Sequence, residues 1–395
     1  MDRESTGQRI ARARRRRGMS QAVLAGLIGR SESWLSQVER GTRSADSHTV
    51  LTRLAEVLRL PLEEITGPGG AEDASRAHLA AELIEQAMMR RGIAGDQREP
   101  ALANLRERAR AAYRAYQATR YDTTGRDLPD LIRDVETASQ VNGADDQSAA
   151  EVRAAVYDTA AALLNRVGEP LLAWTAADRA LSAAEQSGRP VLIALSAWRL
   201  SYVVTSRKHP QQGLDLAMSA AATLERSMGS PSPADLSVYG ALHLAAATAA
   251  SECRDQTATA TLLATARDIA RETGDSNHLG TGFGPVNVAI HALSAAVRLG
   301  DASAAAETGE SLDASVMPDG LIGRRTQVRL DLATAYAMRK QDAAAVNVLL
   351  AAERLSPQLV RYDRRTRDLL AELLRREHRP STPALRPLAH RAGVI

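Results

Sequence analysis

The sequence of 395 residues holds one cysteine, Cys253, and very few aromatic side chains. A single thiol excludes an intrachain disulfide, so the fold must be stable without covalent cross-links, and a reducing compartment is expected. Aromatic residues make up 3% of the chain, whereas hydrophobic residues make up 44%. Few rings and many small apolar side chains favour closely packed helices over a sandwich of strands. The composition therefore predicts an all-α fold.

Segments for export or membrane insertion are also missing. No apolar run approaches 18 residues, and residues 1–17 are too highly charged for a signal peptide. We therefore expect a soluble, cytoplasmic protein with no membrane partner.

Motifs for catalysis and metal binding are absent as well. The sequence has no phosphate-binding Gly-x-x-x-x-Gly-Lys-Ser/Thr loop, no His-Glu-x-x-His and no Cys-x-x-Cys. The eight histidines are scattered, which argues against a zinc site. The sequence predicts a protein that is not an enzyme and that uses no cofactor or metal.

Positive charge is concentrated at the N-terminal end. Residues 1–60 contain 12 arginines and 6 acidic residues, a net charge of +6. The remaining 335 residues contain 38 basic and 41 acidic residues, a net charge of −3. A local excess of arginine is the electrostatic footprint of nucleic-acid binding.

Residues 20–41 have the pattern of two short helices joined by a tight turn. Ser20 and Ser31 are good N-cap residues for the first and the second helix. Gly29 can supply the left-handed residue that ends the first helix, and Gly41 follows the end of the second. The spacing therefore predicts a compact helical hairpin.

The second of these helices has one apolar and one polar side. Its apolar residues recur at helical spacing, and its short polar residues point the other way. The polar side consists of Ser33, Ser36, Gln37 and Arg40. Glutamine and arginine can make paired hydrogen bonds to base edges in the major groove of DNA. A solvated helix face in an ordinary bundle is the alternative.

Further helices are expected on both sides of this pair. We predict helices at 8–17 and 49–58 and the start of a fifth at 61–65, followed by a linker at Gly67–Gly70. The first helix is basic, so its arginines can contact phosphates or form a solvated face. These arginines are Arg12 and Arg14–Arg17.

A family resemblance covers residues 1–66. The motifs that carry it are Gly18-Met19-Ser20-Gln21, Leu24-Ala25, Ile28-Gly29, Ser31 and Val38-Glu39-Arg40-Gly41. In this order they resemble the helix-turn-helix of the phage-repressor and Cro class, also called the XRE family. The resemblance implies a five-helix domain whose third helix, from Ser31 to Arg40, lies in the major groove.

The resemblance also implies roles for individual residues. Gln21 is expected to contact a phosphate, and Arg14 to pair with Glu39. Trp34 departs from the family pattern, and either lies at the edge of the core or packs on a thymine methyl group. The residues expected to contact DNA, at base-reading or backbone positions, are Gln21, Ser31, Glu32, Ser33, Ser36, Gln37, Arg40 and Arg43.

Residues 98–379 show a repeating helical pattern after a linker and connecting helix at 67–97, the helix itself at 77–91. Short breaks precede Ala-rich helical segments at six origins, which are Tyr121, Glu169, Pro210, Asp255, Asp301 and Asp342. A small residue stands nine positions before every origin, as two closely crossing helices require. The pattern resembles a degenerate tetratricopeptide-like array, which implies an α-solenoid of helix pairs that dimerises and receives a signal. Residues 380–395 are assigned to a C-terminal tail.

Two groups of residues in the array are candidates for a ligand site. One group consists of rings at equivalent repeat positions, and the other lies in the Gly-rich stretch 280–291. The alternatives are that the rings fill the core between repeats and that Phe283 fills a gap beside a wide turn. The candidate ligand-binding residues are Tyr157, Asn165, Trp198, Tyr202, His243, Phe283, Asn287 and His291.

A helix-turn-helix followed by such repeats resembles two groups of regulators. One comprises the peptide-pheromone sensors of Gram-positive bacteria, and the other the actinobacterial XRE regulators with helical C-terminal halves, which the sequence resembles more. We therefore hypothesise a nucleoid-associated homodimer that binds a palindromic operator in double-stranded DNA and senses a small molecule or peptide. The alternative is a DNA-tethered scaffold whose array binds a partner protein.

Overall fold

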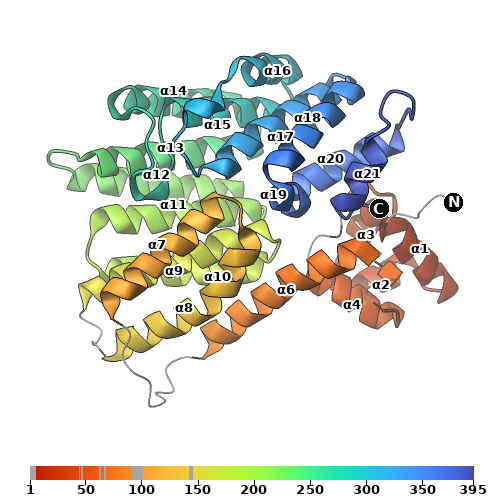
Figure 1. Cartoon of the computed structure of the whole chain (residues 1–395), viewed down its shortest axis with the longest axis horizontal. Coiled ribbons are helices and arrows are strands. Elements are labelled where there is room, and N and C mark those ends of the chain that lie inside the picture. The colour runs from red at the N-terminus through yellow and green to blue at the C-terminus, as the bar shows by residue number, and fades with distance from the viewer. Residues whose placement is uncertain are drawn as a thin grey trace. The chain divides into compact units, whose positions relative to one another are not determined.

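The computed structural model describes residues 6–43, 45, 48–61, 64–65, 68–90, 101–141 and 146–395. The chain divides into two compact units, one formed by Met1–Leu79 with Tyr336–Ile395 and the other by Ala80–Ala335. Within the described residues every regular element is a helix (Figure 1). The predicted all-α class is confirmed.

The N-terminal helices lie close to where the sequence predicts them. They are α1 (Thr6–Arg16), α2 (Gln21–Leu27), α3 (Glu32–Glu39) and α4 (His48–Leu58). Glu64 and Ile65 of the predicted fifth helix are helical, and residues 62 and 63 lie outside the described part of the chain. The four helices enclose one apolar core, whose fully buried side chains include Ile10, Leu24, Leu35 and Leu54.

The connecting helix α6 (Pro68–Met89) begins nine residues before the predicted start at 77. Residues 68–70, which we assigned to a linker, therefore belong to the helix. Proline is favourable at the first helical position because its missing N–H has no intrahelical partner there in any case. Gly67 and the predicted loop at 92–100 lie outside the described residues.

The second helix of each of the six predicted pairs begins where the sequence predicts. The helices of these pairs are α7 (Leu102–Gln117), α8 (Tyr121–Val141), α9 (Gln147–Arg166), α10 (Pro170–Gln186), α11 (Pro190–Ser206), α12 (Pro210–Ser227), α13 (Pro233–Glu252), α14 (Gln256–Thr273), α15 (Pro285–Leu299), α16 (Ala302–Ser311), α17 (Ile322–Met338) and α18 (Asp342–Leu355). Each predicted origin is the first residue or the N-cap of an even-numbered helix. The repeat period read from the sequence is confirmed.

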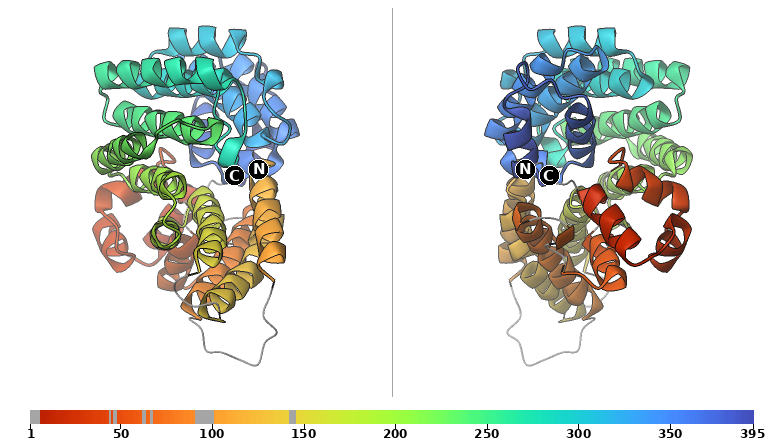
Figure 2. Two further views of the ribbon diagram at one scale, coloured as in Figure 1. Left: turned by 90° about the vertical axis from the view of Figure 1, so that its left-hand side faces the viewer. Right: turned by 90° about the vertical axis from the view of Figure 1, so that its right-hand side faces the viewer.

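The odd-numbered helices of the second unit form a layer. Helices α7, α9, α11, α13 and α15 each pack on the next, and α8, α10, α12, α14 and α16 each pack on the odd-numbered helix before them (Figure 1). The green and cyan helices lie in successive tiers in Figure 2, left. The layer of odd-numbered helices is called the inner layer below.

The sequence repeat reflects a repeated local turn. A residue with positive φ stands two positions before the first residue of each even-numbered helix, and these residues are Thr119, Gly168, Lys208, Arg254, Gly300 and Lys340. The amide of the following residue donates to the carbonyl five positions earlier, as Asp255 N does to Ala250 O at 3.0 Å. Both features define the Schellman cap, so each helix pair is set by local backbone chemistry.

The small residues predicted at the helix crossings are placed as expected. Ala112, Ala160, Ser201, Ala246 and Ala333 are buried, and Ala292 packs at the edge of a core cluster. Side chains of this size allow the two helices of a pair to approach closely.

A connector between α14 and α15 ties distant parts of the second unit together. It contains the 3₁₀ helix η1 (His278–Gly280). The carbonyl of Gly280 accepts hydrogen bonds from the Tyr113 hydroxyl and from Gln117 Nε2, both at 2.9 Å. The side-chain amides of Gln117 and Asn277 also bond each other, at 3.0 and 3.2 Å. Helix α7 is thereby fixed to a segment about 160 residues further along the chain.

Three helices follow α18 at the C-terminal end. They are α19 (Pro357–Tyr362), α20 (Arg364–Arg375) and α21 (Leu385–Arg391), so the predicted tail at 380–395 contains a short helix. Of the helices described, none is long and apolar enough to cross a membrane.

Candidate functional site

Helices α2 and α3 each begin at a serine cap, and a left-handed glycine ends α2 in the turn between them. Ser20 Oγ accepts from the amide of Val23, and Ser31 Oγ accepts from the amide of Trp34, each at 3.2 Å. Gly29 has φ of 67° and lets the Arg30 amide donate to the Ala25 carbonyl at 2.9 Å. The two serine caps and the left-handed glycine predicted from the sequence are confirmed.

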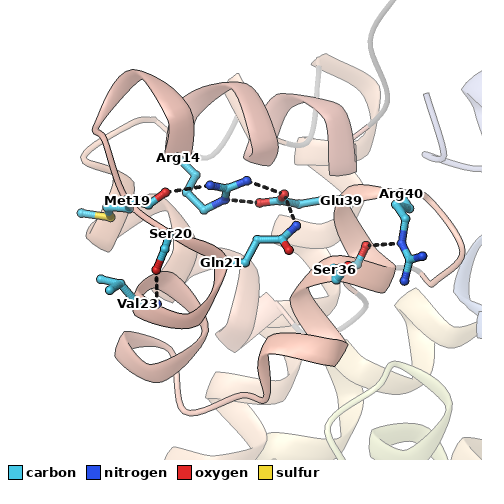
Figure 3. Close-up of polar contacts among 8 residues, drawn as sticks. All are labelled: Arg14, Met19, Ser20, Gln21, Val23, Ser36, Glu39 and Arg40. Carbon is cyan, nitrogen blue, oxygen red and sulfur yellow. Dashed lines mark hydrogen bonds and ion pairs between the residues drawn. The ribbon is translucent and has the colours of Figure 1, made fainter.

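A buried ion pair joins α1 to α3. Arg14 Nε and Nη2 donate to the two carboxylate oxygens of Glu39 at 2.6 and 2.8 Å, and Nη1 donates to the Met19 carbonyl at 2.7 Å (Figure 3). Gln21 Nε2 donates to the same carboxylate at 2.7 Å. Burial opposes ionisation of Glu39, but the bonds from Arg14 and Gln21 outweigh it and lower the pKa of this carboxyl. The expected pairing of Arg14 with Glu39 is present.

Gly7 allows α1 to approach the end of α3. A Cβ atom at this position would overlap the carbonyl oxygen of Val38. Gly7 was not predicted as a functional position, because no motif marks a single glycine near the N-terminus. It fixes the same two helices that the Arg14–Glu39 pair joins.

The polar side of α3 is free of the domain core. Glu32, Ser33 and Arg40 are exposed, and Ser36 and Gln37 are partly exposed. At 100° per residue these five side chains fall on one side of the helix, opposite the buried Leu35 and Val38. Arg40 Nε donates to the Ser36 carbonyl at 3.2 Å (Figure 3). The structure thus places the predicted base-reading residues on one surface.

The remaining predicted DNA-binding residues lie at the edges of this surface. Gln21 already gives one amide hydrogen to Glu39, so one hydrogen remains for a phosphate. Ser31 caps α3 through its lone pair and keeps its own hydroxyl hydrogen. The backbone amide of Arg43 donates to the Gln37 carbonyl at 3.2 Å. Trp34 is partly buried against the core, with Arg30 stacked 5.7 Å from its ring centre.

The basic helix α1 divides into two sides. Arg12, Arg15, Arg16 and Arg17 are exposed and can face phosphates. Arg14 is buried in its pair with Glu39, so its inclusion among the phosphate-contacting arginines is corrected.

The predicted ligand residues of α9 make contacts within the array. Tyr157 is fully buried, and its hydroxyl donates to Glu136 Oε1 at 2.7 Å and accepts from Arg179 at 3.2 Å. Burial and the neighbouring Glu136 raise the pKa of Tyr157 to about 12. Asn165 Oδ1 accepts from Ser206 Oγ at 2.6 Å.

Three more predicted ligand residues lie on α11 and α13. Trp198 and His243 are buried, and Tyr202 lies edge-on to Trp198 with ring centres 5.7 Å apart. His243 Nδ1 lies 3.0 Å from the Tyr239 carbonyl. Burial lowers the pKa of His243, so its ring is held neutral. With Tyr157, these rings occupy the packing between helix pairs, as the alternative interpretation has it.

The Gly-rich stretch 280–291 contributes one side chain to the apolar core and two polar side chains to the inner layer. Phe283 is fully buried in a cluster with Leu244, Ala247 and Val288. Asn287 and His291, one turn apart on α15, are buried as well. His291 Nδ1 lies 3.2 Å from Thr248 Oγ1 of α13. The structure therefore separates Phe283, a core residue, from the two polar residues.

The inner layer holds a carboxylate that sequence reasoning missed. Asp158 of α9 is buried; its Oδ2 accepts from Ser196 Oγ at 2.9 Å, and Oδ1 has no hydrogen-bond partner among the described residues. Burial outweighs the attraction of Arg199 and raises the pKa of Asp158 to about 6.

Replacing Asp158 by asparagine is expected to remove a pH-dependent destabilisation. The folded-state pKa of about 6 exceeds the ordinary 3.8, so Asp158 lowers stability as pH rises between these values. The free energy of unfolding of Asp158→Asn, measured relative to that of the wild type, should therefore rise by about 3 kcal/mol between pH ~4 and pH ~7. Urea unfolding at both pH values measures this gain, with the exposed Asp178→Asn as control. An equal gain in the control would contradict the assignment.

The comparisons with known proteins agree with the geometry of the N-terminal domain. A family model described as a helix-turn-helix domain matches residues 6–66. No curated protein is similar enough to the chain to count as a match. Among solved structures, the chain is similar to Bacillus thuringiensis PlcR in complex with the peptide PapR7 and DNA, at 14% identity and a TM-score of 0.32, over 87% of this chain and 100% of that one. The family match at 6–66 shows that the chain carries a helix-turn-helix domain ahead of its helical array.

Proposed function

We propose that the chain is a sequence-specific DNA-binding transcriptional regulator whose array dimerises and senses a small molecule or peptide. The supporting observation is the polar side of α3, which is exposed while a buried Arg14–Glu39 pair fixes the helix behind it. A rigid helix with a polar outer side suits the major groove, which admits one α-helix. The net charge of +6 on residues 1–60 attracts the phosphate backbone.

Each exposed side chain has a defined chemical use in the groove. Gln37 can bond an adenine edge with two hydrogen bonds, and Glu32 can accept from a cytosine amino group. Arg40 and the exposed arginines of α1 neutralise phosphates, which adds affinity without sequence information. Ser33 and Gln37 are short, so one domain makes few base contacts. Two domains, placed about 34 Å apart by a dimer, are therefore needed for specific binding.

The array is the element through which a signal would act. A ligand that binds one curvature of the array more tightly than another would shift the spacing of the two recognition helices. DNA binding would then follow ligand concentration. The hydrogen bond between Tyr113 of α7 and Gly280 of η1 would couple the curvature of the array to binding of the ligand.

Selection of duplexes from a random library by the full chain tests the proposal. We expect an enriched palindromic sequence whose half-sites are centred about 10 base pairs apart. Footprinting of the selected duplex should show protection of both half-sites on one side of the helix. Recovery of unenriched sequence at about 0.15 M salt would contradict sequence-specific binding.

Replacing Gln37 by alanine is expected to weaken binding by about 1–3 kcal/mol at one base step of each half-site. The loss arises because alanine cannot bond the base edge. Fluorescence anisotropy with duplexes altered one base pair at a time measures it. The exposed Gln211→Ala in α12 is the control and should bind as the wild type does. An equal loss on every duplex would instead mark Gln37 as a backbone contact.

A further inference from the structure

Three arginines, two from the inner layer and one from α17, converge on one region of the second unit. Arg199 of α11, Arg298 of α15 and Arg324 of α17 all lie close enough to Tyr202 to act on its hydroxyl. Arg324 also acts on His291 of α15 and on Tyr113 of α7. Helices that are far apart in sequence therefore bring their cations to one place.

Of the three, Arg298 has an acidic ion-pair partner, Arg199 bonds a phenol hydroxyl and is attracted by the nearby Asp158, and Arg324 has no side-chain partner among the described residues. Arg298 Nε bonds Glu252 at 3.0 Å, and Arg199 faces Asp158 and bonds the Tyr113 hydroxyl at 3.1 Å. The guanidinium of Arg324 makes no hydrogen bond or ion pair with any residue that the structure describes. It is partly buried, and a guanidinium withdrawn from water is stabilised by an anion.

Neutral hydrogen-bonding groups surround this cation. Thr248 uses its hydroxyl hydrogen on the Leu244 carbonyl at 2.9 Å, so in its contact with His291 the hydroxyl accepts and Nδ1 donates. Burial and the arginines 324 and 298 keep His291 neutral. Its other nitrogen, Nε2, is therefore an acceptor. Asn287 Oδ1, one turn earlier on the same helix, is buried with no hydrogen-bond partner in the described part of the chain.

We propose that Arg324 binds the oxyanion of a ligand, a carboxylate or phosphate, while His291 Nε2 accepts a hydrogen bond from a donor on the same ligand. The guanidinium fork matches the oxygens of such a group. The ligand class is thus an acid with a neighbouring hydroxyl or N–H. Such a ligand would be the signal in the proposed function, and the regulatory role of this site rests on that function. Arg324 is the charge partner, and Tyr202 and Asn287 are further polar contacts.

Thermal unfolding of the full chain with two matched probes tests the site. At neutral pH inorganic phosphate carries both an oxyanion and an O–H donor, whereas sulfate carries only acceptors. At equal ionic strength and about ten times the Kd, phosphate should raise Tm by about 3 °C more than sulfate does. A second pair, N-acetylglycine and its amide, reveals whether a peptide-like carboxylate is also accepted.

Variants separate binding from a structural role. Arg324→Gln should abolish the phosphate-specific rise, while without anion its Tm should equal or exceed that of the wild type, because an unpaired cation has been removed. Arg324→Lys should keep part of the rise. The exposed Arg267→Gln on α14 is the matched control and should keep all of it.

Each outcome decides the proposal. A full phosphate-specific rise in Arg324→Gln, or no such rise in the wild type, would overturn it. The selected DNA duplex is titrated in parallel, without phosphate. Specific DNA binding without an anion effect would leave the proposed regulator intact and remove this site. An anion effect without specific DNA binding would keep this site and contradict the proposed regulator.

Discussion

Replacing Glu39 by alanine is expected to destabilise the helix-turn-helix domain by about 3–5 kcal/mol. The side chains of Arg14 and Glu39 are 10% and 3% exposed, so the variant leaves a guanidinium buried with the Met19 carbonyl as its remaining partner. Gln21 loses its acceptor at the same time. The unpaired charge accounts for most of the cost, since its hydration is not restored.

Hydrogen exchange of the amides in α1–α4 of the full chain measures this loss. Exchange should accelerate on the order of 10²–10⁴-fold in Glu39→Ala. Glu39→Gln retains an acceptor and should show a smaller effect. The matched control is Glu56→Ala, which breaks an ion pair with Arg53 whose two side chains are 61% and 60% exposed. Such a pair contributes little, so equal acceleration in the two alanine variants would contradict the role given to Glu39.

The pair also sets the acid limit of this domain. The folded-state pKa of Glu39 lies below its ordinary value of 4.5. Its contribution to stability is therefore complete above pH 4.5 and is lost as pH falls through the folded-state value. Because α3 is held by this pair, DNA binding should weaken in the same pH range.

Replacing Phe283 by alanine is expected to destabilise the second unit by about 3–5 kcal/mol. The ring is fully buried between α13 and α15, and the Gly240 backbone lies directly against it. A Cβ atom at Gly240 would overlap the ring, so Gly240→Ala should cost about 1–3 kcal/mol. Removing the ring makes room for that methyl group.

The two substitutions should therefore compensate each other. Adding Gly240→Ala to Phe283→Ala should raise stability or leave it unchanged, whereas the same change in the wild type lowers it. Urea unfolding of the four proteins, followed by circular dichroism, gives the interaction energy. Phe283→Leu serves as the conservative variant, with an expected loss below that of alanine. Additive losses would show that Phe283 and Gly240 are not in contact.

The local features of this fold, its turns and caps, could be predicted from the sequence. The six origins were predictable because each follows a Schellman turn and several are capping residues, such as Asp255 and Asp301. The α2–α3 turn was predictable for the same reason, from Ser31 and Gly29. Local capping failed as a guide at Pro68, where a Gly-Pro-Gly-Gly run resembles a linker but begins α6.

The long-range contacts could not be predicted in this way. The bonds from Tyr113 and Gln117 to Gly280 depend on the curvature accumulated over several helix pairs. The meeting of Arg199, Arg298 and Arg324 depends on the same curvature, and no spacing in the sequence encodes it. Tyr157, Trp198 and His243 do share a repeat position, but periodicity alone does not distinguish an open groove from a packed core.

The exposed side of α3 is proposed to read base sequence. Competition between the selected duplex and a random duplex of equal length, followed by anisotropy at about 0.15 M salt, tests it most directly. We predict that the wild type binds the selected duplex at least ~10³-fold more tightly. Gln37→Ala should lower that ratio while leaving the affinity for the random duplex unchanged. A wild-type ratio near one would contradict base reading by α3.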